Sequence, residues 1–301
     1  MSDFNGNSSP AGGQGSPTGG QGFQADDARS SSGEMRPLSE IDPKALAEVE
    51  FVLTDIDDTL TEEGKLLPEA YDALWRLSRA GYSLLPVTGR PAGWCDMIIR
   101  QWPVDAVVGE NGAFVYYADE GEESGPYKSF IHPSVATGDI SSRLERVERE
   151  VFRRVPKVRR AKDQPFRIFD LAVDFNEDEP RYGLETAGEV AAVCREMGAE
   201  AKISSIHVNT WFGSYDKLDA SLRFLKEWKG VDRDEAKRKV LFCGDSPNDE
   251  PMFSFFPLSC GVANIRQYGH LMTRPPTYVT GRPFGYGFAE LAERLLRNRG
   301  V

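Results

Sequence analysis

Four short polar runs hold the side-chain types that phosphoryl transfer needs: Asp55–Thr59, Thr88–Arg90, Lys217 and Gly244–Asp249. They supply carboxylates for attack and for proton transfer, a hydroxyl and an ammonium for a phosphoryl group, and acidic oxygens for Mg²⁺. Each run alone is a weak signal, because polar residues also cap ordinary strands and helices. One helix and one strand fit between the first two runs and again between the last two, so we interpret all four as one site.

Asp55 and Asp57 directly follow Val49–Thr54, an apolar run that predicts a buried parallel strand. Ligands of open parallel sheets bind at the carboxyl ends of the strands. We therefore expect Asp55 to be the nucleophile and a Mg²⁺ ligand. Asp57 is expected to protonate the leaving oxygen and then to activate water, and Thr59 to tie the loop. Taken alone, the run is equally well explained as an Asx turn at a strand end.

Thr88, Gly89, Lys217 and Asn248 are assigned to the phosphoryl group. Thr88 ends the second predicted strand, and Gly89 lets the backbone approach a ligand closely. Lys217 lies in a first helical turn, where a cation opposes the helix dipole and a bound phosphate would favour it. Individually, a capping threonine and a solvated lysine are the simpler explanations.

Asp245 and Asp249 are the predicted acidic partners of Asp55 at the metal. Asp245 comes just after the apolar strand Lys239–Cys243, and Asp249 lies one helical turn further on. Hard carboxylate oxygens with few other ligands suit Mg²⁺, which keeps several waters. The alternative is a capped helix start with acidic residues in its first turn.

The elements around these runs predict an α/β protein with a doubly wound parallel sheet. Strand and helix patterns alternate through 46–120 and resume through 211–301, and we assign both segments to one core domain. Residues 121–210 are predicted to form a small α/β domain inserted into that core, with helices near 135–155 and 182–197 and three strands. Residues 1–45 are rich in Gly, Ser, Pro and Gln with few aliphatics, which predicts a disordered tail.

Composition narrows the class of protein. An apolar fraction of 40% in 301 residues is ordinary for a protein with a real core. The net charge of −11 argues against nucleic acid as a partner. The four cysteines form no CxxC pair, so we expect buried, reduced thiols. Neither a membrane-length apolar run nor the pattern of a signal peptide is visible, and we expect a cytoplasmic protein without a membrane partner.

These motifs resemble those of the haloacid dehalogenase superfamily of phosphohydrolases, over residues 48–297. The inserted domain resembles a C2 cap of the C2B subtype, on a Rossmann-like core. That subtype is similar to sucrose-, trehalose- and mannosyl-phosphoglycerate phosphatases and to phosphomannomutases. The motifs are DxDxT, a threonine, an ENG turn, a lysine and GDxxND, which stand here at Asp55–Thr59, Thr88, Glu110–Gly112, Lys217 and Gly244–Asp249.

The resemblance implies a Mg²⁺ site made by the Asp55 carboxylate, the Asp57 carbonyl oxygen, Asp245 and Asp249. It also implies that Thr88 and Lys217 hold the phosphoryl oxygens. Asp58 departs from the pattern, since many members have glycine at that position.

Cap residues would select the substrate. Alternation in Ser205–Trp211 puts His207 and Asn209 on one polar face, and we expect them to contact substrate hydroxyls, with Asn111 lining the same cleft. An ordinary solvent-facing sheet surface is the alternative. Between Arg143 and Arg167, basic residues outnumber acidic ones by 10 to 4. This excess indicates either solvated helix faces or a site for a second anionic group.

The favoured hypothesis is a Mg²⁺-dependent phosphomonoesterase that acts on a small phosphorylated sugar or glycoside. A sugar phosphomutase with the same nucleophile is the alternative, and a non-catalytic binding or regulatory protein is the third. The expected partner is a small phosphorylated metabolite.

Overall fold

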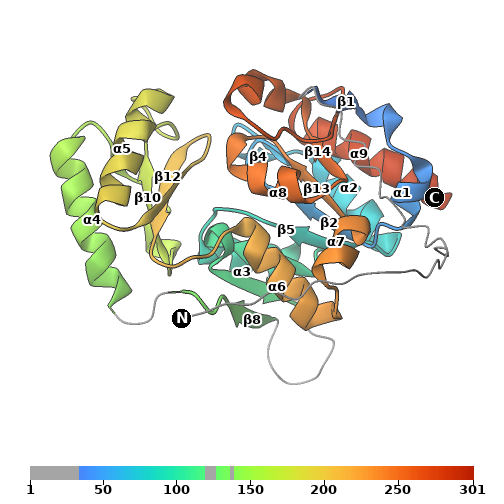
Figure 1. The fold of residues 1–301 in the computed structure, drawn as a ribbon, viewed down its shortest axis with the longest axis horizontal. Coiled ribbons are helices and arrows are strands. Elements are labelled where there is room, and N and C mark those ends of the chain that lie inside the picture. Colours follow the sequence, from blue (N-terminus) through green and yellow to red (C-terminus); the bar gives the residue numbers. More distant parts are fainter. Residues whose placement is uncertain (1–33, 119–126, 136–138) are drawn as a thin grey trace, which may run out of the picture. The chain divides into compact units, whose positions relative to one another are not determined.

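Six parallel strands form the central sheet, in the order β1-β15-β14-β13-β2-β5 (Figure 1). The structure is a computed structural model that describes residues 34–118, 127–135 and 139–301. The strands are β1 (Arg36–Pro37), β2 (Phe51–Thr54), β5 (Ser83–Pro86), β13 (Val240–Gly244), β14 (Ser259–Gly261) and β15 (Tyr278–Val279).

Strand side chains alternate between two hydrophobic clusters, one on each face of the sheet. In β2, Val52 belongs to one cluster, whereas Phe51 and Leu53 belong to the other. Helices on both faces of a parallel sheet define a doubly wound α/β core, so the predicted fold class is confirmed. The covering helices are α2 (Pro68–Arg79) and α9 (Phe284–Arg299) on the first face, and α6 (Lys217–Lys229) and α8 (Glu250–Phe255) on the second.

Beside the parallel sheet lies an antiparallel one, made of β6 (Ala106–Gly109), β7 (Phe114–Tyr117) and β8 (Lys128–Ile131). A parallel bridge between Val87 and Val108 joins β6 to the end of β5. The third strand expected in the parallel sheet is thus the first strand of a meander. The remaining core elements are β3 (Thr61–Glu62), β4 (Lys65–Leu66), α3 (Ala92–Gln101), η2 (Glu110–Gly112), α7 (Arg233–Lys239), η4 (Pro247–Asp249) and η5 (Ala263–Leu271).

Residues 34–45 correct the expectation of a disordered tail over 1–45. Besides β1, this segment forms η1 (Leu38–Glu40) and enters α1 (Pro43–Ala47). Two aliphatic residues, Leu38 and Ile41, are buried in the core, and β1 pairs in parallel with β15, where Arg36 N–H donates to Thr277 O at 3.0 Å. A short segment can therefore be ordered by an existing sheet edge, which its composition does not reveal. Residues 1–33 lie outside the described residues.

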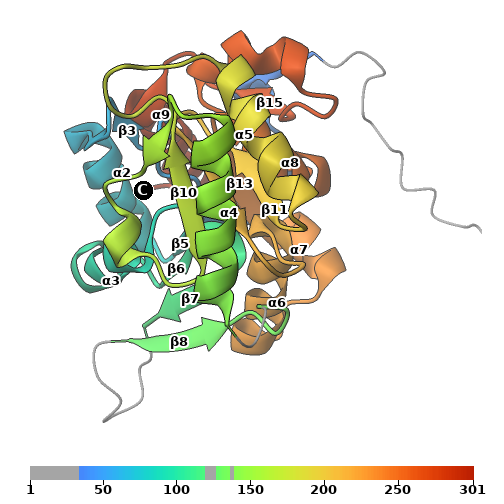
Figure 2. The same ribbon diagram turned by 90° about the vertical axis from the view of Figure 1, so that its left-hand side faces the viewer.

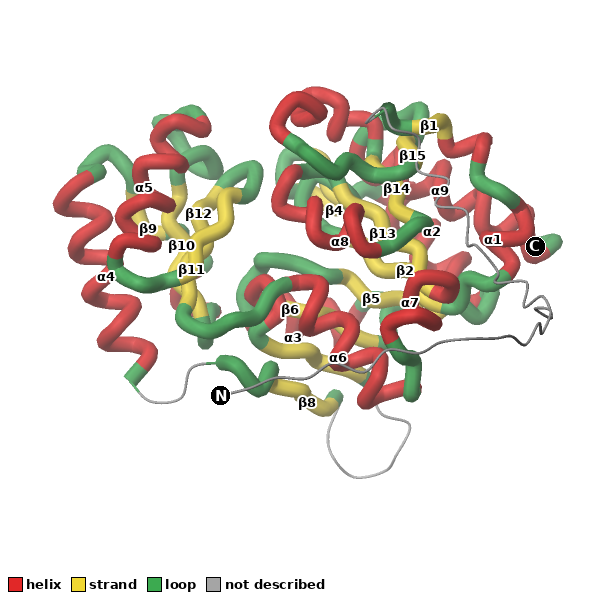
Figure 3. The backbone as a smooth tube through the Cα atoms, viewed as in Figure 1, coloured by secondary structure: helices red, strands yellow, loops and turns green. Residues whose placement is uncertain are grey.

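The inserted segment forms a four-stranded antiparallel sheet in the order β11-β12-β10-β9, covered on one face by two helices. In Figures 1 and 3 those helices lie on the side of the sheet that faces away from the core, and Figure 2 shows them in front of it. The elements are α4 (Ile140–Arg154), β9 (Arg159–Arg160), η3 (Gln164–Phe166), β10 (Asp170–Asp174), α5 (Leu184–Glu196), β11 (Glu200–Ile203) and β12 (His207–Trp211).

Most element boundaries match the predictions, with three exceptions. The helix expected near 135–155 begins at Ile140. Alternation in Phe166–Phe175 predicts a strand there, but β10 begins at Asp170, because the preceding residues form η3. The apolar pattern near the end of the chain predicts a helix from Phe288, whereas α9 begins at Phe284 and contains two glycines. The four cysteines are free and buried, as expected. Among the described residues, the structure has no helix of the length and apolarity that a membrane crossing requires.

Candidate active site

Three aspartates meet where β2 and β13 end. Asp55 follows β2 and Asp245 follows β13, and the two strands are paired so that Asp55 donates its backbone N–H to Cys243 at 2.9 Å. Carboxylate oxygens of Asp55, Asp245 and Asp249 all lie within 4.8 Å of one another and are buried. A side chain at Gly244 would place its Cβ 2.4 Å from Asp249, so the approach of these carboxylates requires glycine there.

The ammonium of Lys217 lies between two of these carboxylates. Its Nζ is 2.7 Å from Asp55 Oδ1 and 2.8 Å from Asp249 Oδ1, and all three side chains are buried. Burial lowers the pKa of Lys217, but Asp249 and Asp55 outweigh it, so the net shift is upward. Lys217 begins α6 behind Asp216, whose side chain caps the helix. The helix start thus fixes the cation despite the unfavourable dipole.

Negative charge remains in excess at this centre. Burial raises the pKa of Asp55 to about 8, and Asp249 and Asp57 add to the effect. Burial, with Asp55 and Asp249 nearby, also raises the pKa of Asp245. Thr59 donates to Asp245 Oδ1 at 3.4 Å, whereas Oδ2 is buried with no hydrogen-bond partner. A buried carboxylate oxygen without a partner is costly, so this group of hard oxygen donors fits a divalent cation such as Mg²⁺.

The loop after β5 is held in place by a hydrogen bond between its backbone and the Thr88 hydroxyl. Thr88 is fully buried, and its Oγ1 accepts the N–H of Arg90 at 3.0 Å. At Gly89 an added Cβ would lie 3.1 Å from Asn111 Nδ2. Asn111 is itself buried, and its Nδ2 has no partner. The loop and Asn111 therefore bring hydrogen-bond donors next to the three aspartates.

A small cavity of about 20 Å³ collects most of the predicted site residues. Thr88, Lys217 and Asp249 do not line it: Lys217 binds both Asp55 and Asp249, and the Thr88 hydroxyl accepts the N–H of Arg90 within the loop. The lining includes eight predicted residues, namely Asp55, Asp57, Gly89, Asn111, His207, Asn209, Asp245 and Asn248.

Arg90 is a site residue for which the sequence pattern predicted no role of its own. Its guanidinium binds both carboxylate oxygens of Asp57, with three N–O distances from 2.8 to 3.0 Å. It also reaches the inserted domain, at 3.2 Å from Glu177 Oε1 and 3.6 Å from Asp163 Oδ2. The sequence signal for this role is an arginine directly after a Thr-Gly at a strand end, 33 positions from Asp57. A planar guanidinium can bind both oxygens of a carboxylate.

His207 and Asn209 point to the cavity, but acidic neighbours hold their polar ends. His207 Nε2 lies 2.9 Å from Glu177 Oε2, and Asn209 Nδ2 lies 3.0 Å from Asp170 Oδ2. The hydrogen bond from His207 lowers the pKa of Glu177 to about 2, with a further contribution from Arg90. Both residues are buried, unlike those of a plain solvent face. Their contact with a substrate stays a prediction.

The basic stretch from Arg143 to Arg167 is mostly paired within its own domain. Arg159 binds Asp174 at 2.8 Å, and Arg160 binds Glu148. Arg167 lines the small cavity, yet its guanidinium donates to Asp163 and Asp170 at 2.9 Å. These pairs favour the interpretation as internal ion pairs over a site for a second anion.

A cavity of about 500 Å³ adjoins the small one and shares Asp57, Arg90, Ser205 and Ile206 with it. Its other walls are mostly polar, and they include Asp58, Asn176, Glu177, Arg181, Asn264, Gln267 and Tyr268. Polar side chains from both domains thus border an open volume directly beside Asp57.

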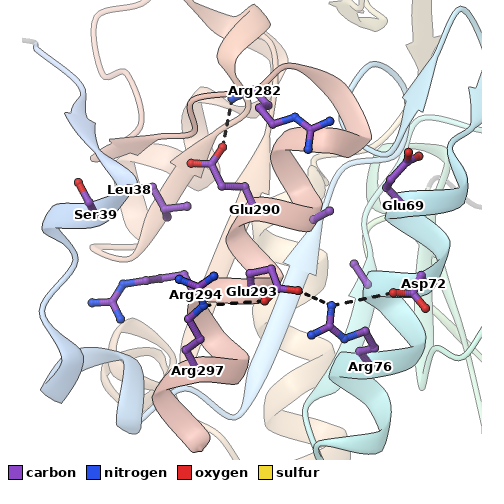
Figure 4. Close-up of a pocket in the computed structure, with 12 residues that line it drawn as sticks. Leu38, Ser39, Glu69, Asp72, Arg76, Arg282, Glu290, Glu293, Arg294 and Arg297 are labelled. Carbon is purple, nitrogen blue, oxygen red and sulfur yellow. Dashed lines mark hydrogen bonds and ion pairs between the residues drawn. The ribbon is translucent and has the colours of Figure 1, made fainter. Parts of the chain in front are cut away.

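Another cavity, of about 570 Å³, lies between α2, α9 and η1 and shares no lining residue with the site (Figure 4). Its charged residues satisfy one another: Arg76 pairs with Glu293, and Glu290 accepts the backbone N–H of Arg282 at 3.1 Å. It offers no group of convergent, unpaired donors comparable with that around Asp55.

Comparison with known proteins gives a family match for part of the chain and a shared fold for most of it. Residues 52–136 match the family profile of haloacid dehalogenase-like hydrolases. This match covers less than a third of the chain, and the rest of the chain is similar in fold to solved structures of haloacid dehalogenase-like proteins. A comparison of the sequence with curated proteins finds no match.

Solved structures share the fold over most of both chains. A protein of Thermoplasma acidophilum is 18% identical, with 82% of this chain and 98% of the other covered and a TM-score of 0.63. Sucrose-phosphatase of Synechocystis, in complex with sucrose and phosphate, is 15% identical, with 81% and 97% covered and a TM-score of 0.53. A subclass IIB sugar phosphatase of the superfamily is 12% identical, with 82% and 98% covered and a TM-score of 0.54.

Proposed function

We propose that this chain is a Mg²⁺-dependent phosphomonoesterase that hydrolyses a small phosphorylated sugar or glycoside through an aspartyl-phosphate on Asp55. The observation that carries the proposal is the buried centre of Asp55, Lys217, Asp245 and Asp249, which has one ammonium for three carboxylates and an unpartnered oxygen on Asp245. Such a centre lowers the stability of a protein that binds neither a metal nor a phosphoryl group, because buried charge is left without compensation.

In this proposal the residues divide into three roles. Asp55 attacks phosphorus in line, and the phosphoryl–oxygen bond to the leaving group breaks as the new bond forms. Asp57 gives the leaving oxygen its proton and then takes one from the water that attacks the aspartyl-phosphate, which releases phosphate and restores Asp55. Phosphoryl oxygens are held by the phosphate-binding residues Thr88, Gly89, Lys217 and Asn248.

Mg²⁺ would be held by the carboxylates of Asp55, Asp245 and Asp249 and by the Asp57 carbonyl oxygen. Its chemistry is to neutralise charge on the phosphoryl group, which otherwise repels an anionic nucleophile. Lys217 contributes a second positive charge from the protein itself.

The open cavity beside Asp57 suits the leaving group. Its roughly 500 Å³ lies within the range of small-ligand sites, and its carboxylate, amide and hydroxyl groups match a polyhydroxylated molecule. Two solved structures that share the fold are a sucrose-phosphatase and a sugar phosphatase, which supports this substrate class. We assign 46–120 and 211–301 to the core domain and 121–210 to the cap, except that β8 (Lys128–Ile131) pairs with β7 and belongs to the core. Asn111, His207 and Asn209 are the proposed substrate contacts.

The test is release of inorganic phosphate, with Mg²⁺, from a panel of phosphorylated monosaccharides, disaccharides and glycosyl-phosphoglycerates. Asp55→Asn is the matched control, because it keeps the size of the side chain and removes the nucleophile. Mg²⁺-dependent release that disappears in Asp55→Asn supports the proposal. Movement of the phosphoryl group between hydroxyls of a hexose phosphate without release would instead support a mutase.

A further inference from the structure

Glu110 is a buried carboxylate that connects the core to the cap and has no part in the chemistry described above. Oε1 accepts the N–H of Ala92, at the start of α3, at 3.1 Å and that of Ile168, in the cap, at 2.9 Å. Oε2 accepts the N–H groups of Phe169 at 2.6 Å and of Asp170 at 3.1 Å. One side chain therefore satisfies four backbone donors, three of which belong to the cap.

The cap segment next to this carboxylate lies tightly against the core. A Cβ on Gly93 would be 2.9 Å from the Cβ of Phe166, so α3 and the segment meet where only glycine fits. The Phe166 ring packs edge-on against Trp94, with centroids 5.6 Å apart. Arg167 donates to the carbonyl oxygen of Gly89 at 2.9 Å.

The turn that carries Glu110 also carries Asn111 into the catalytic cavity. Both residues have positive φ, at 43° and 57°, which costs free energy and is retained where the surroundings enforce it. Glu110 N–H donates to Arg90 O at 3.1 Å, and Asn111 N–H donates to Thr88 O at 3.0 Å. Asn111 is 5% exposed, and its unpartnered Nδ2 belongs to a side chain that lines the cavity with Asp55.

We propose that Glu110 is a positioning residue that couples docking of the cap segment 168–170 to the placement of Asn111, whose amide donates a hydrogen bond to the phosphate ester. This inference rests on the proposed function for the ligand of Asn111, but the link from Glu110 to the cap does not. Docked cap amides fix the carboxylate, the carboxylate fixes the strained turn, and the turn directs Nδ2 into the cavity. Without these amides the Glu110 side chain keeps only the N–H of Ala92, and the strained turn is held by its backbone bonds to Arg90 and Thr88 alone.

The experiment combines amide hydrogen exchange with a double-mutant cycle. Glu110→Gln keeps the shape but turns one acceptor oxygen into a donor that faces other N–H groups. We expect exchange of peptides covering 168–170 to rise about tenfold or more, with α4 and α5 unchanged. Glu148→Gln, a buried glutamate that pairs with Arg160 inside the cap, is the matched control and should leave 168–170 protected.

The cycle measures kcat/KM for para-nitrophenyl phosphate with Mg²⁺. Glu110→Gln and Asn111→Ala are each expected to lower it about tenfold, and the double variant to fall no more than about twofold below the lower single variant, because one acts through the other. Phe166→Ala loosens the same segment without changing Glu110, so it should also raise exchange at 168–170. Combined with Asn111→Ala, it should show the same non-additivity in kcat/KM. This second cycle tests the proposal if the Glu110 variant does not fold.

Unchanged exchange at 168–170 in Glu110→Gln and Phe166→Ala, or effects that multiply in the double variants, would overturn the proposal. An inactive wild-type enzyme would overturn the proposed function instead. In that case the exchange arm still decides the link between Glu110 and the cap.

Discussion

The guanidinium of Arg90 hydrogen-bonds both carboxylate oxygens of Asp57, at N–O distances of 2.8 to 3.0 Å. It also forms ion pairs with Glu177 and Asp163 of the cap. Burial lowers the pKa of Arg90, but the three carboxylates outweigh it, so the arginine is a permanent cation. A proton-transfer group is effective only in the correct orientation, and this contact fixes the orientation of Asp57.

Arg90→Lys is predicted to lower kcat by about ten- to hundredfold, because lysine keeps the charge but cannot hold both oxygens of Asp57. Arg294→Lys, in the separate cavity of Figure 4, is the matched control and should retain wild-type kcat. Steady-state kinetics on the best panel substrate measure both. Equal kcat in the two variants would show that the orientation of Asp57 does not depend on the guanidinium.

Lys217→Met is predicted to lower the free energy of unfolding by about 3 kcal/mol without Mg²⁺, because it leaves Asp55 and Asp249 buried without their cation. Added Mg²⁺ should recover part of this loss, since a second cation offsets the same carboxylates. Urea titrations with and without Mg²⁺ provide the comparison. A variant as stable as the wild type in chelator would contradict the importance of these ion pairs.

The sequence was sufficient for the parts of the site that follow from strand ends. Asp55 and Asp245 come directly after apolar runs, so a parallel sheet had to bring them to one edge, and the structure places their carboxylates within 4.8 Å together with Asp249. At these strand ends, the order of residues along the chain is enough to place the side chains. The same reasoning predicted Val49–Thr54 for β2 and Lys239–Cys243 for β13, within two residues of each observed end.

The sequence could not predict contacts that depend on how the cap packs against the core. Arg90 and Glu110 bind cap groups 87 and 58 positions away, and which groups these are depends on how two separately folded surfaces meet. Tertiary packing also overrode composition in α9. An added Cβ on Gly285 would lie 2.6 Å from Leu60 O, so glycines that weaken a helix in isolation are required by the neighbouring chain.

Asp245→Asn is predicted to raise the midpoint of thermal unfolding in chelator and to abolish its increase with Mg²⁺. The substitution removes a buried charge whose Oδ2 has no partner, and it removes a metal ligand. Wild-type protein should gain about 2.7 kcal/mol of stability at a Mg²⁺ concentration near 100 times its Kd. Asp72→Asn, in the cavity of Figure 4, is the control that keeps the Mg²⁺ response. A Mg²⁺ shift that survives in Asp245→Asn would place the metal elsewhere.

Stability is predicted to fall as pH rises from about 5 to about 7. Burial and the neighbouring Asp170 raise the pKa of Glu110 from 4.5 to about 7 in the folded state. In that window the folded state binds a proton that the unfolded state has already lost, so the contribution of this proton is present below pH 4.5 and lost as pH rises through 7. Glu110→Gln should flatten this part of the curve in urea titrations, and an identical slope in the variant would assign the effect to other groups.

The most direct test of the account is to look for the covalent intermediate. Asp57→Asn removes the group that activates water, whereas the leaving group of para-nitrophenyl phosphate needs no proton from Asp57. Acid quenching during turnover of this substrate with Mg²⁺ should therefore trap the aspartyl-phosphate. The account predicts that the peptide containing Asp55 gains the mass of one phosphoryl group, and that the gain is absent in Asp55→Asn. Phosphate release by the wild type, with no phosphorylated Asp55 peptide in Asp57→Asn under any quench time, would contradict it.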